Sequence, residues 1–218
     1  MTTAPKPAIR GLYVIVDPEQ TRGRDAVEVA RQAIEGGASV IQWRDKARDK
    51  GEQLPQLRAV RDLCRRHGAI LIDNDHADLS LACQADGVHL GQKDLPPAAV
   101  RAFAPPEFIV GVSTNSVEEA RRAQADGASY VAVGALFATA SKADTRPASP
   151  QRLREVKQAV SVPVVGIGGI NEGNIDEVLA AGADAVAVIS AVTGADDVRE
   201  AAAGLAAKFA PPREQAAG

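Results

Sequence analysis

Short apolar runs rich in valine and isoleucine alternate along the chain with alanine-rich stretches whose apolar residues recur at helical spacing. Parallel strands that are buried on both faces and joined by crossover helices produce this pattern. The apolar runs predict strands at residues 12–16, 39–43, 69–72, 87–90, 108–112, 130–133, 164–167 and 185–189. The amphipathic stretches predict helices at residues 25–35, 53–66, 77–83, 97–102, 117–125, 150–158, 174–180 and 196–209.

Three of the predicted helices end in the same way, on a glycine followed by alanine just before the next strand. These glycines are Gly37, Gly127 and Gly182. Each fits a left-handed position after a helix, and the recurrence indicates one strand-helix unit repeated around a ring. Eight such units predict an α/β protein with a (β/α)8 TIM-barrel fold, whereas an open doubly wound sheet rarely has eight units of such even length. We expect a single domain over residues 1–218, with a core of about 11–209 and a flexible tail at 210–218.

The composition fits a globular protein with a sizeable core, because 45% of the 218 residues are hydrophobic. A formal net charge of −3 provides no basic surface of the kind that binds a nucleic-acid backbone. Cys64 and Cys83 lack the spacing of metal ligands, so we expect buried thiols in a reducing compartment. The first residues lack an apolar stretch long enough for a signal peptide or membrane span, which predicts a cytoplasmic protein. The sequence leaves open whether the chain forms a homo-oligomer.

Side chains that follow the predicted strands are the candidates for chemistry, because barrel active sites lie at the carboxyl ends of the strands. After the second strand, Gln42, Arg44 and Lys46 alternate and point the same way while the chain stays extended. An arginine able to make bidentate contacts and a nearby lysine suit a diphosphate. The further charges at 45 and 48–50 fit a solvated charged turn equally well.

Two carboxylates, Asp75 and Asp94, follow the third and fourth predicted strands and are expected at the same end of the barrel. Hard oxygen ligands completed by water suit a magnesium ion that carries a phosphorylated substrate. The alternative is that each aspartate caps the helix that follows it. Asn74 can donate to a phosphate oxygen or cap a helix. His76 and His89 lack metal-ligand spacing and are interpreted as structural histidines.

The later strand ends carry hydroxyls, a lysine and glycine-rich turns. Ser113 follows the fifth strand, and the long loop at 134–146 contains Thr139, Ser141 and Lys142. Hydroxyls beside a lysine suit a phosphate cradle that closes as a lid, although small polar residues are also common in plain surface loops.

The last two strand ends have the character of a phosphate site. The glycine-rich run 166–170 follows the seventh strand, and Ile189 and Ser190 follow the eighth. Phosphate is often bound there by backbone N–H groups. A glycine-rich loop alone is a weak signal, but suitable groups follow seven of the eight predicted strands.

In this order the motifs resemble the thiamine phosphate synthase family. They are Gln-x-Arg-x-Lys after the second strand, Asn-Asp after the third, Gly-Gln-x-Asp after the fourth, Gly-Val-Ser after the fifth, Thr-x-Ser-Lys after the sixth, Gly-Ile-Gly-Gly-Ile after the seventh and Ile-Ser after the eighth. The resemblance runs from about residue 12 to about residue 191. It implies a magnesium-dependent transferase that joins hydroxymethylpyrimidine diphosphate to thiazole phosphate, giving thiamine phosphate and diphosphate.

The resemblance also implies roles for individual residues. It implies that the pyrimidine diphosphate is bound by Gln42, Arg44, Lys46, Asn74 and Lys142, with Ser113 near the pyrimidine. It implies that the thiazole phosphate is bound by Thr139, Ser141, Gly169, Ile189 and Ser190, and that Mg²⁺ is bound by Asp75 and Asp94. The candidate binding set also includes the motif neighbours Trp43, Asp45 and Ala140. The candidate catalytic residues are Arg44, Lys46, Lys142 and Ser113.

The implied chemistry needs no protein nucleophile, because diphosphate leaves once its growing charge is offset and an aminopyrimidine stabilises the remaining cation. Two other functions are weighed against it. One is an isomerase of the same fold that aromatises the thiazole phosphate, and the other is a non-catalytic barrel that binds a phosphate ligand. The combined set of cations and carboxylates argues against both, although the sequence alone leaves both open. Asp73 stands where the family usually has an aliphatic residue and has no assigned role.

Overall fold

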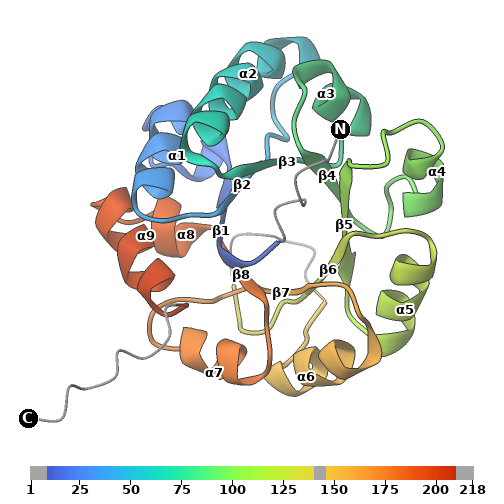
Figure 1. Cartoon of the computed structure of the whole chain (residues 1–218). Helices are drawn as coiled ribbons and strands as arrows, with labels where there is room; N and C mark the ends of the chain where they lie inside the picture. Colours follow the sequence, from blue (N-terminus) through green and yellow to red (C-terminus); the bar gives the residue numbers. More distant parts are fainter. Residues whose placement is uncertain (1–8, 140–145, 210–218) are drawn as a thin grey trace, which may run out of the picture.

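The strands run parallel and close into one barrel in chain order, as the computed structural model in Figure 1 shows. The structure describes residues 9–139 and 146–209. Its strands are β1 Gly11–Val16, β2 Val40–Trp43, β3 Ile70–Asn74, β4 Gly87–Leu90, β5 Ile109–Thr114, β6 Tyr130–Val133, β7 Val164–Ile167 and β8 Ala185–Val188. Because β8 pairs with β1, the sheet has no open edge, and the predicted (β/α)8 barrel is confirmed.

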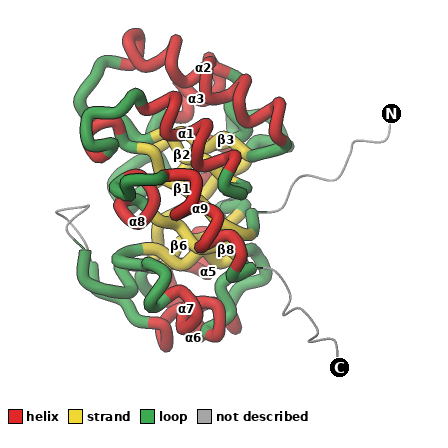
Figure 2. The backbone as a smooth tube through the Cα atoms, turned by 90° about the vertical axis from the view of Figure 1, so that its left-hand side faces the viewer, coloured by secondary structure: helices red, strands yellow, loops and turns green. Residues whose placement is uncertain are grey.

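Helices surround the strands on the outside of the barrel (Figure 2). They are α1 Ala26–Glu35, α2 Lys50–His67, α3 Ala77–Cys83, α4 Pro97–Arg101, α5 Val117–Ala125, α6 Pro150–Ala159, α7 Ile175–Ala180, α8 Ser190–Thr193 and α9 Val198–Ala207, with a 3-10 turn η1 at Pro18–Gln20. The sequence pattern did not predict η1 or α8, because each is too short to show a helical period. Within the two described ranges, no helix combines the length and the apolar content that crossing a membrane requires.

Helix ends follow local capping chemistry. The Asp25 side chain accepts from the backbone N–H of Glu28, so α1 begins one residue later than its predicted start. The Asp197 side chain caps α9 in the same way, through the backbone N–H of Glu200. The glycines that end the repeated units have positive φ angles as predicted, with values of 100° at Gly37, 92° at Gly127 and 97° at Gly182.

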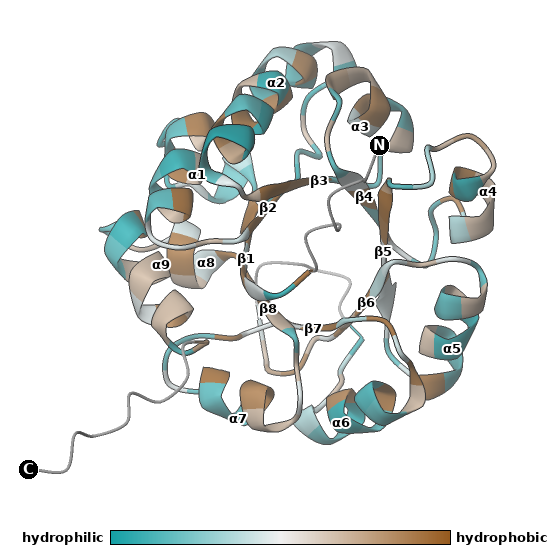
Figure 3. Cartoon of the chain, in the orientation of Figure 1, coloured by the Kyte–Doolittle hydropathy of each residue, from teal (hydrophilic) through white to brown (hydrophobic). Residues whose placement is uncertain are grey.

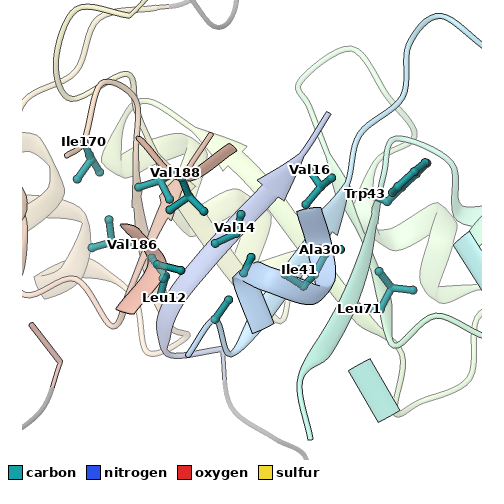
Figure 4. Close-up of a cluster of buried hydrophobic side chains, with 14 of the residues drawn as sticks. Leu12, Val14, Val16, Ala30, Ile41, Trp43, Leu71, Ile170, Val186 and Val188 are labelled. Carbon is teal, nitrogen blue, oxygen red and sulfur yellow. The ribbon is translucent and has the colours of Figure 1, made fainter. Parts of the chain in front are cut away.

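Successive strand residues alternate between the barrel interior and the layer beneath the helices. Figure 4 shows part of that outer layer, in which Leu12, Val14 and Trp43 pack with side chains from the helices. Tyr13 and Ile15, from the same strand as Leu12, belong instead to the interior cluster. The outward-facing surfaces of the helices are largely polar, as Figure 3 shows. This alternation decides which residues near the strand ends face the interior.

The two cysteines are buried as predicted, with exposures of 1% for Cys64 and 0% for Cys83. Burial raises the pKa of the Cys64 thiol to about 12 and that of the Cys83 thiol to about 11. Since thiolate is the reactive form, we expect neither thiol to react with a disulfide reagent in the native protein at pH 8. Both should react after denaturation. Stoichiometric labelling of the folded protein would contradict this prediction.

Candidate active site at the carboxyl end of the barrel

Two of the predicted diphosphate-binding cations lie near the ends of β1, β2 and β3, each paired with a carboxylate. Arg44 follows β2, and its guanidinium donates to Asp17, a buried carboxylate that follows β1. Lys46 is exposed, and its ammonium nitrogen lies 3.1 Å from Oδ2 of Asp75, beyond the end of β3. Asn74, the last residue of β3, is half-buried. The structure therefore gathers cations and carboxylates from three consecutive strands.

The two candidate metal ligands are neighbours, because the side chains of Asp75 and Asp94 are hydrogen-bonded to each other. Asp75 has a φ angle of 67°, and its backbone N–H donates to the carbonyl oxygen of His89 over 2.8 Å. Oδ2 of Asp94 accepts from the backbone N–H of Gly91 over 2.6 Å. Neither aspartate caps the next helix, since the residue before α3 is His76 and the residue before α4 is Pro96.

The pKa values of the two carboxyl groups shift in opposite directions. Burial acts to raise the pKa of Asp75, but the hydrogen bond from Asp94 and the positive charge of Lys46 together hold that pKa below its usual value. Burial and the adjacent Asp75 raise the pKa of Asp94. The pair therefore favours holding one proton or a cation between its oxygens.

The chemistry of this pair fits a magnesium ion. Carboxylate oxygens are the hard ligands that Mg²⁺ prefers, and the ion usually keeps water and substrate phosphate in its shell. In the part of the chain that the structure describes, no group of three or more histidine, cysteine or acidic residues gathers around one point. The two aspartates thus fit an ion whose other ligands come from water and substrate, and they do not form an all-protein cage.

The candidate pyrimidine-binding residues face the barrel interior. Gln42 on β2 is 3% exposed, and its Nε2 donates to the Tyr13 hydroxyl over 2.7 Å. Oγ of Ser113 on β5 lies 2.9 Å from Nε2 of His89. His89 is buried with both ring nitrogens hydrogen-bonded, which agrees with its interpretation as a structural histidine.

The candidate phosphate-binding loops are held together by backbone contacts. The backbone N–H of Leu136 donates to Ile167, and that of Phe137 donates to Gly168, so the loop after β6 runs beside the loop after β7. Gly169 has a φ angle of 66°, and a Cβ there would come within 2.5 Å of the carbonyl oxygen of Ala138. This close approach places the half-buried Thr139 near the glycine loop. Beyond β8, Ile189 precedes α8 and the exposed Ser190 begins it.

Several sequence candidates are not brought into this group. The Trp43 side chain is fully buried in the outer layer, where the Arg48 guanidinium lies 5.8 Å from its ring centroid. The Asp45 carboxylate accepts from the backbone N–H groups of Ala47 and Arg48 and pairs with the Arg48 side chain, so it closes its own turn. Ala140, Ser141 and Lys142, which belong to the central part of the predicted lid, lie outside the described residues.

Other residues of the site escaped the sequence interpretation. Asp17, which holds Arg44, follows the first strand, and its position after a buried apolar run is the same signal as at Asp75. Tyr13 and Tyr130 occupy interior positions of β1 and β6. Their signal was a large side chain with a polar hydroxyl at an interior-facing position of an otherwise apolar strand.

The fold and the groups at its carboxyl end define a (β/α)8-barrel enzyme with charged and glycine-rich groups at the strand ends. The thiamine monophosphate synthase family model matches residues 12–192, and the chain belongs to this family. The resemblance found in the motifs is thereby confirmed, and with it the enzyme class, a transferase of thiamine biosynthesis.

Individual relatives agree with the family. A thiamine-phosphate synthase from Methanocella arvoryzae is 51% identical over 197 residues, which cover 90% of this chain and 93% of the relative. One from Methanospirillum hungatei is 47% identical and covers 88% of this chain and 93% of its own length. The solved structure of a thiamine phosphate pyrophosphorylase from Pyrococcus furiosus has a TM-score of 0.84 at 41% identity, covering 91% of this chain and 94% of that one. None of these three names indicates an isomerase or a non-catalytic binding protein.

Proposed function

We propose that the carboxyl end of this barrel couples hydroxymethylpyrimidine diphosphate to thiazole phosphate, releasing diphosphate, with Mg²⁺ bound by Asp75 and Asp94. The observation that carries the proposal is the contact of Lys46, Asp75 and Asp94, which joins three strand ends in one cluster of opposite charges. A metal-bound diphosphate is the ligand whose charges complement both parts of such a cluster. The substrates are thus small phosphorylated molecules.

Diphosphate departure is the step in which the protein's cations act. Arg44 and Lys46 lie on the same strand end, and we assign Lys142 and Asn74 to the same diphosphate. Their positive charge and donors stabilise the negative charge that grows on the leaving group, and a bound Mg²⁺ adds to this effect. Gln42 and Ser113 hold the aminopyrimidine, whose ring stabilises the methylene cation that remains.

Capture by the thiazole nitrogen needs the second substrate to be held close to that cation. We assign its phosphate to the loops after β6, β7 and β8. The residues are Thr139, Ser141, Gly169, Ile189 and Ser190. The packing of Gly169 against the Ala138 backbone supports one continuous pocket wall there. Catalysis then rests on positioning and electrostatics, without a covalent enzyme intermediate.

Product formation tests the proposal directly. Purified protein is incubated with both substrates and Mg²⁺, and thiamine phosphate and diphosphate are measured by chromatography. Equal amounts of the two products are expected, with none formed when either substrate is omitted or when a chelator removes the metal. Absence of thiamine phosphate from a folded sample with both substrates and metal would show that the proposal is wrong.

Asp94→Asn tests the metal assignment. The change keeps the size of the side chain but removes one charge from the metal pair, so we expect turnover at low Mg²⁺ to fall by at least about tenfold and to recover partly at high Mg²⁺. Rates are measured across a magnesium titration, with the exposed Asp62→Asn as control. An equal loss at every magnesium concentration, together with a lower melting temperature, would indicate that Asp94 acts only by closing its turn at Gly91.

A further inference from the structure

A continuous line of side-chain hydrogen bonds crosses the barrel interior from β2 to β5. Gln42 Nε2 donates to the Tyr13 hydroxyl over 2.7 Å, and the Tyr13 and Tyr130 hydroxyls are 2.9 Å apart. The Tyr130 hydroxyl lies 2.9 Å from Nδ1 of His89, and Nε2 of His89 lies 2.9 Å from Oγ of Ser113. The two ends of this line, which we call the interior chain, are the two residues assigned to the aminopyrimidine.

The interior chain depends on a missing side chain in β5. His89 on β4 pairs in register with Gly111 on β5, and Gly111 pairs with Tyr130 on β6, so the three residues lie in one row across neighbouring strands. A Cβ at Gly111 would overlap the Tyr130 ring. The glycine therefore lets Tyr130 cross β5 and stack against the His89 ring, with the ring centroids 5.6 Å apart.

The hydrogen bonds of the interior chain have one common direction. An amide nitrogen can only donate, so the Tyr13 oxygen accepts from Gln42, and the single hydroxyl proton of Tyr13 goes to Tyr130. Tyr130 in turn donates to Nδ1 of His89, so in the neutral imidazole the ring proton lies on Nε2, which donates to Ser113. Burial raises the pKa of both tyrosines, so each hydroxyl keeps its one proton.

This direction decides what the two ends offer a ligand. One N–H of Gln42 is engaged with Tyr13 inside the barrel, which fixes the orientation of the amide, and Oε1 is the acceptor that it offers a ligand. Ser113 accepts from His89 and keeps its own hydroxyl proton, which makes it a donor. An aminopyrimidine has the complementary groups, because its amino group donates and its ring nitrogens accept.

We propose that Tyr13, Tyr130 and His89 are positioning residues that fix Gln42 as an acceptor and Ser113 as a donor, and so select an amino-substituted over an oxo-substituted pyrimidine. The proposal rests on the proposed function in taking the pyrimidine to contact both ends of the interior chain. An oxo group in place of the amino group would face the Gln42 oxygen with a second acceptor. Rotation of the glutamine to relieve this contact would break the donor bond to Tyr13 and would require every hydrogen bond of the interior chain to reverse, with the His89 proton moving from Nε2 to Nδ1.

The test compares binding of two ligands by calorimetry, which does not require turnover. The ligands are the aminopyrimidine monophosphate and its oxo counterpart, neither of which can release diphosphate. Native protein is expected to bind the amino form at least about tenfold more tightly, the scale of one mispaired polar contact. Tyr130→Phe removes only the hydroxyl that joins the two halves of the interior chain, and is expected to shrink this preference to about threefold or less.

Two further variants keep the test decisive. Tyr13→Phe interrupts the chain at the neighbouring hydroxyl and should have the same effect, which covers a failure of Tyr130→Phe to fold. Thr114→Val removes a buried hydroxyl of β5 that donates to the carbonyl of Ala132 and is not part of the interior chain, and should leave the amino preference unchanged. An unchanged preference in folded Tyr130→Phe or Tyr13→Phe, or no preference in native protein, overturns the inference. Failure of the proposed function is a separate result, the absence of thiamine phosphate from the native protein's coupling reaction.

Discussion

Arg44→Ala is expected to lower kcat/KM for the pyrimidine diphosphate by roughly a hundredfold or more, the equivalent of a few kcal/mol of transition-state stabilisation. The guanidinium is the bidentate group of the proposed diphosphate site, and the remaining cations cannot reproduce its planar geometry. Initial rates over a range of both substrates give the effect, which should appear for the diphosphate and leave KM for the thiazole phosphate nearly unchanged.

The structure adds a stability cost that the sequence did not predict. Arg44 is the partner of Asp17, whose carboxylate is 1% exposed, so its removal leaves a buried charge with only local partners. We expect a loss on the order of 1–3 kcal/mol in the free energy of unfolding. Asp17→Asn in the Arg44→Ala background should restore much of this stability without restoring turnover.

A matched control lies in the following turn. Arg48 pairs with the buried Asp45 as Arg44 pairs with Asp17, but its guanidinium packs over Trp43, whose side chain belongs to the outer layer. Arg48→Ala should therefore lower the free energy of unfolding while turnover of the folded protein stays near the native value. If Arg44→Ala and Arg48→Ala reduced turnover equally, loss of folded protein would explain both effects and Arg44 would have no special role.

Asp73→Asn is expected to remove a large pH dependence of stability. Asp73 is 1% exposed, its Oδ1 accepts from the backbone N–H of Asn74, and its Oδ2 has no partner among the described residues. Burial raises the pKa of this carboxyl to about 8. The folded protein thus binds a proton that the unfolded chain has already released, and folding loses stability as the pH rises through this range.

The sign and the size follow from that shift. The contribution of Asp73 is most favourable below the usual aspartate pKa of 3.8 and is progressively lost up to a pH of about 8. Between pH 5 and pH 8 we expect native protein to lose on the order of 2–4 kcal/mol relative to Asp73→Asn, since each pKa unit corresponds to about 1.4 kcal/mol. Urea unfolding at several pH values measures the difference, and the exposed Asp62→Asn should parallel the native protein. Parallel curves for native protein and Asp73→Asn would show that Asp73 ionises normally.

The strands were predictable because their buried runs are rich in valine and isoleucine, and the barrel followed from the even spacing of the units. Side chains two residues apart on a strand lie on the same side. Trp43 therefore lies on the side of Ile41, and Asp73 on the side of Leu71, which is the outer layer. The sequence alone could have excluded Trp43 as a contact through its side chain. It could not show that Arg44 meets Asp17, or that Asp75 meets Asp94, because those contacts depend on how neighbouring strand ends converge in three dimensions.

Because Gly111 leaves room for the Tyr130 ring, the residues that are tolerated at position 111 depend on the residue at position 130. Any larger residue at 111 needs the space that the Tyr130 ring occupies, so it becomes acceptable only in a background where residue 130 is small. Conversely, an alanine at 130 leaves a void beside Gly111 that a larger residue could fill, while disconnecting His89 from Tyr13. In a library of paired variants the two positions should therefore show strong epistasis. Double variants with a larger residue at 111 and a smaller one at 130 should recover packing, but they should not recover the preference for the aminopyrimidine.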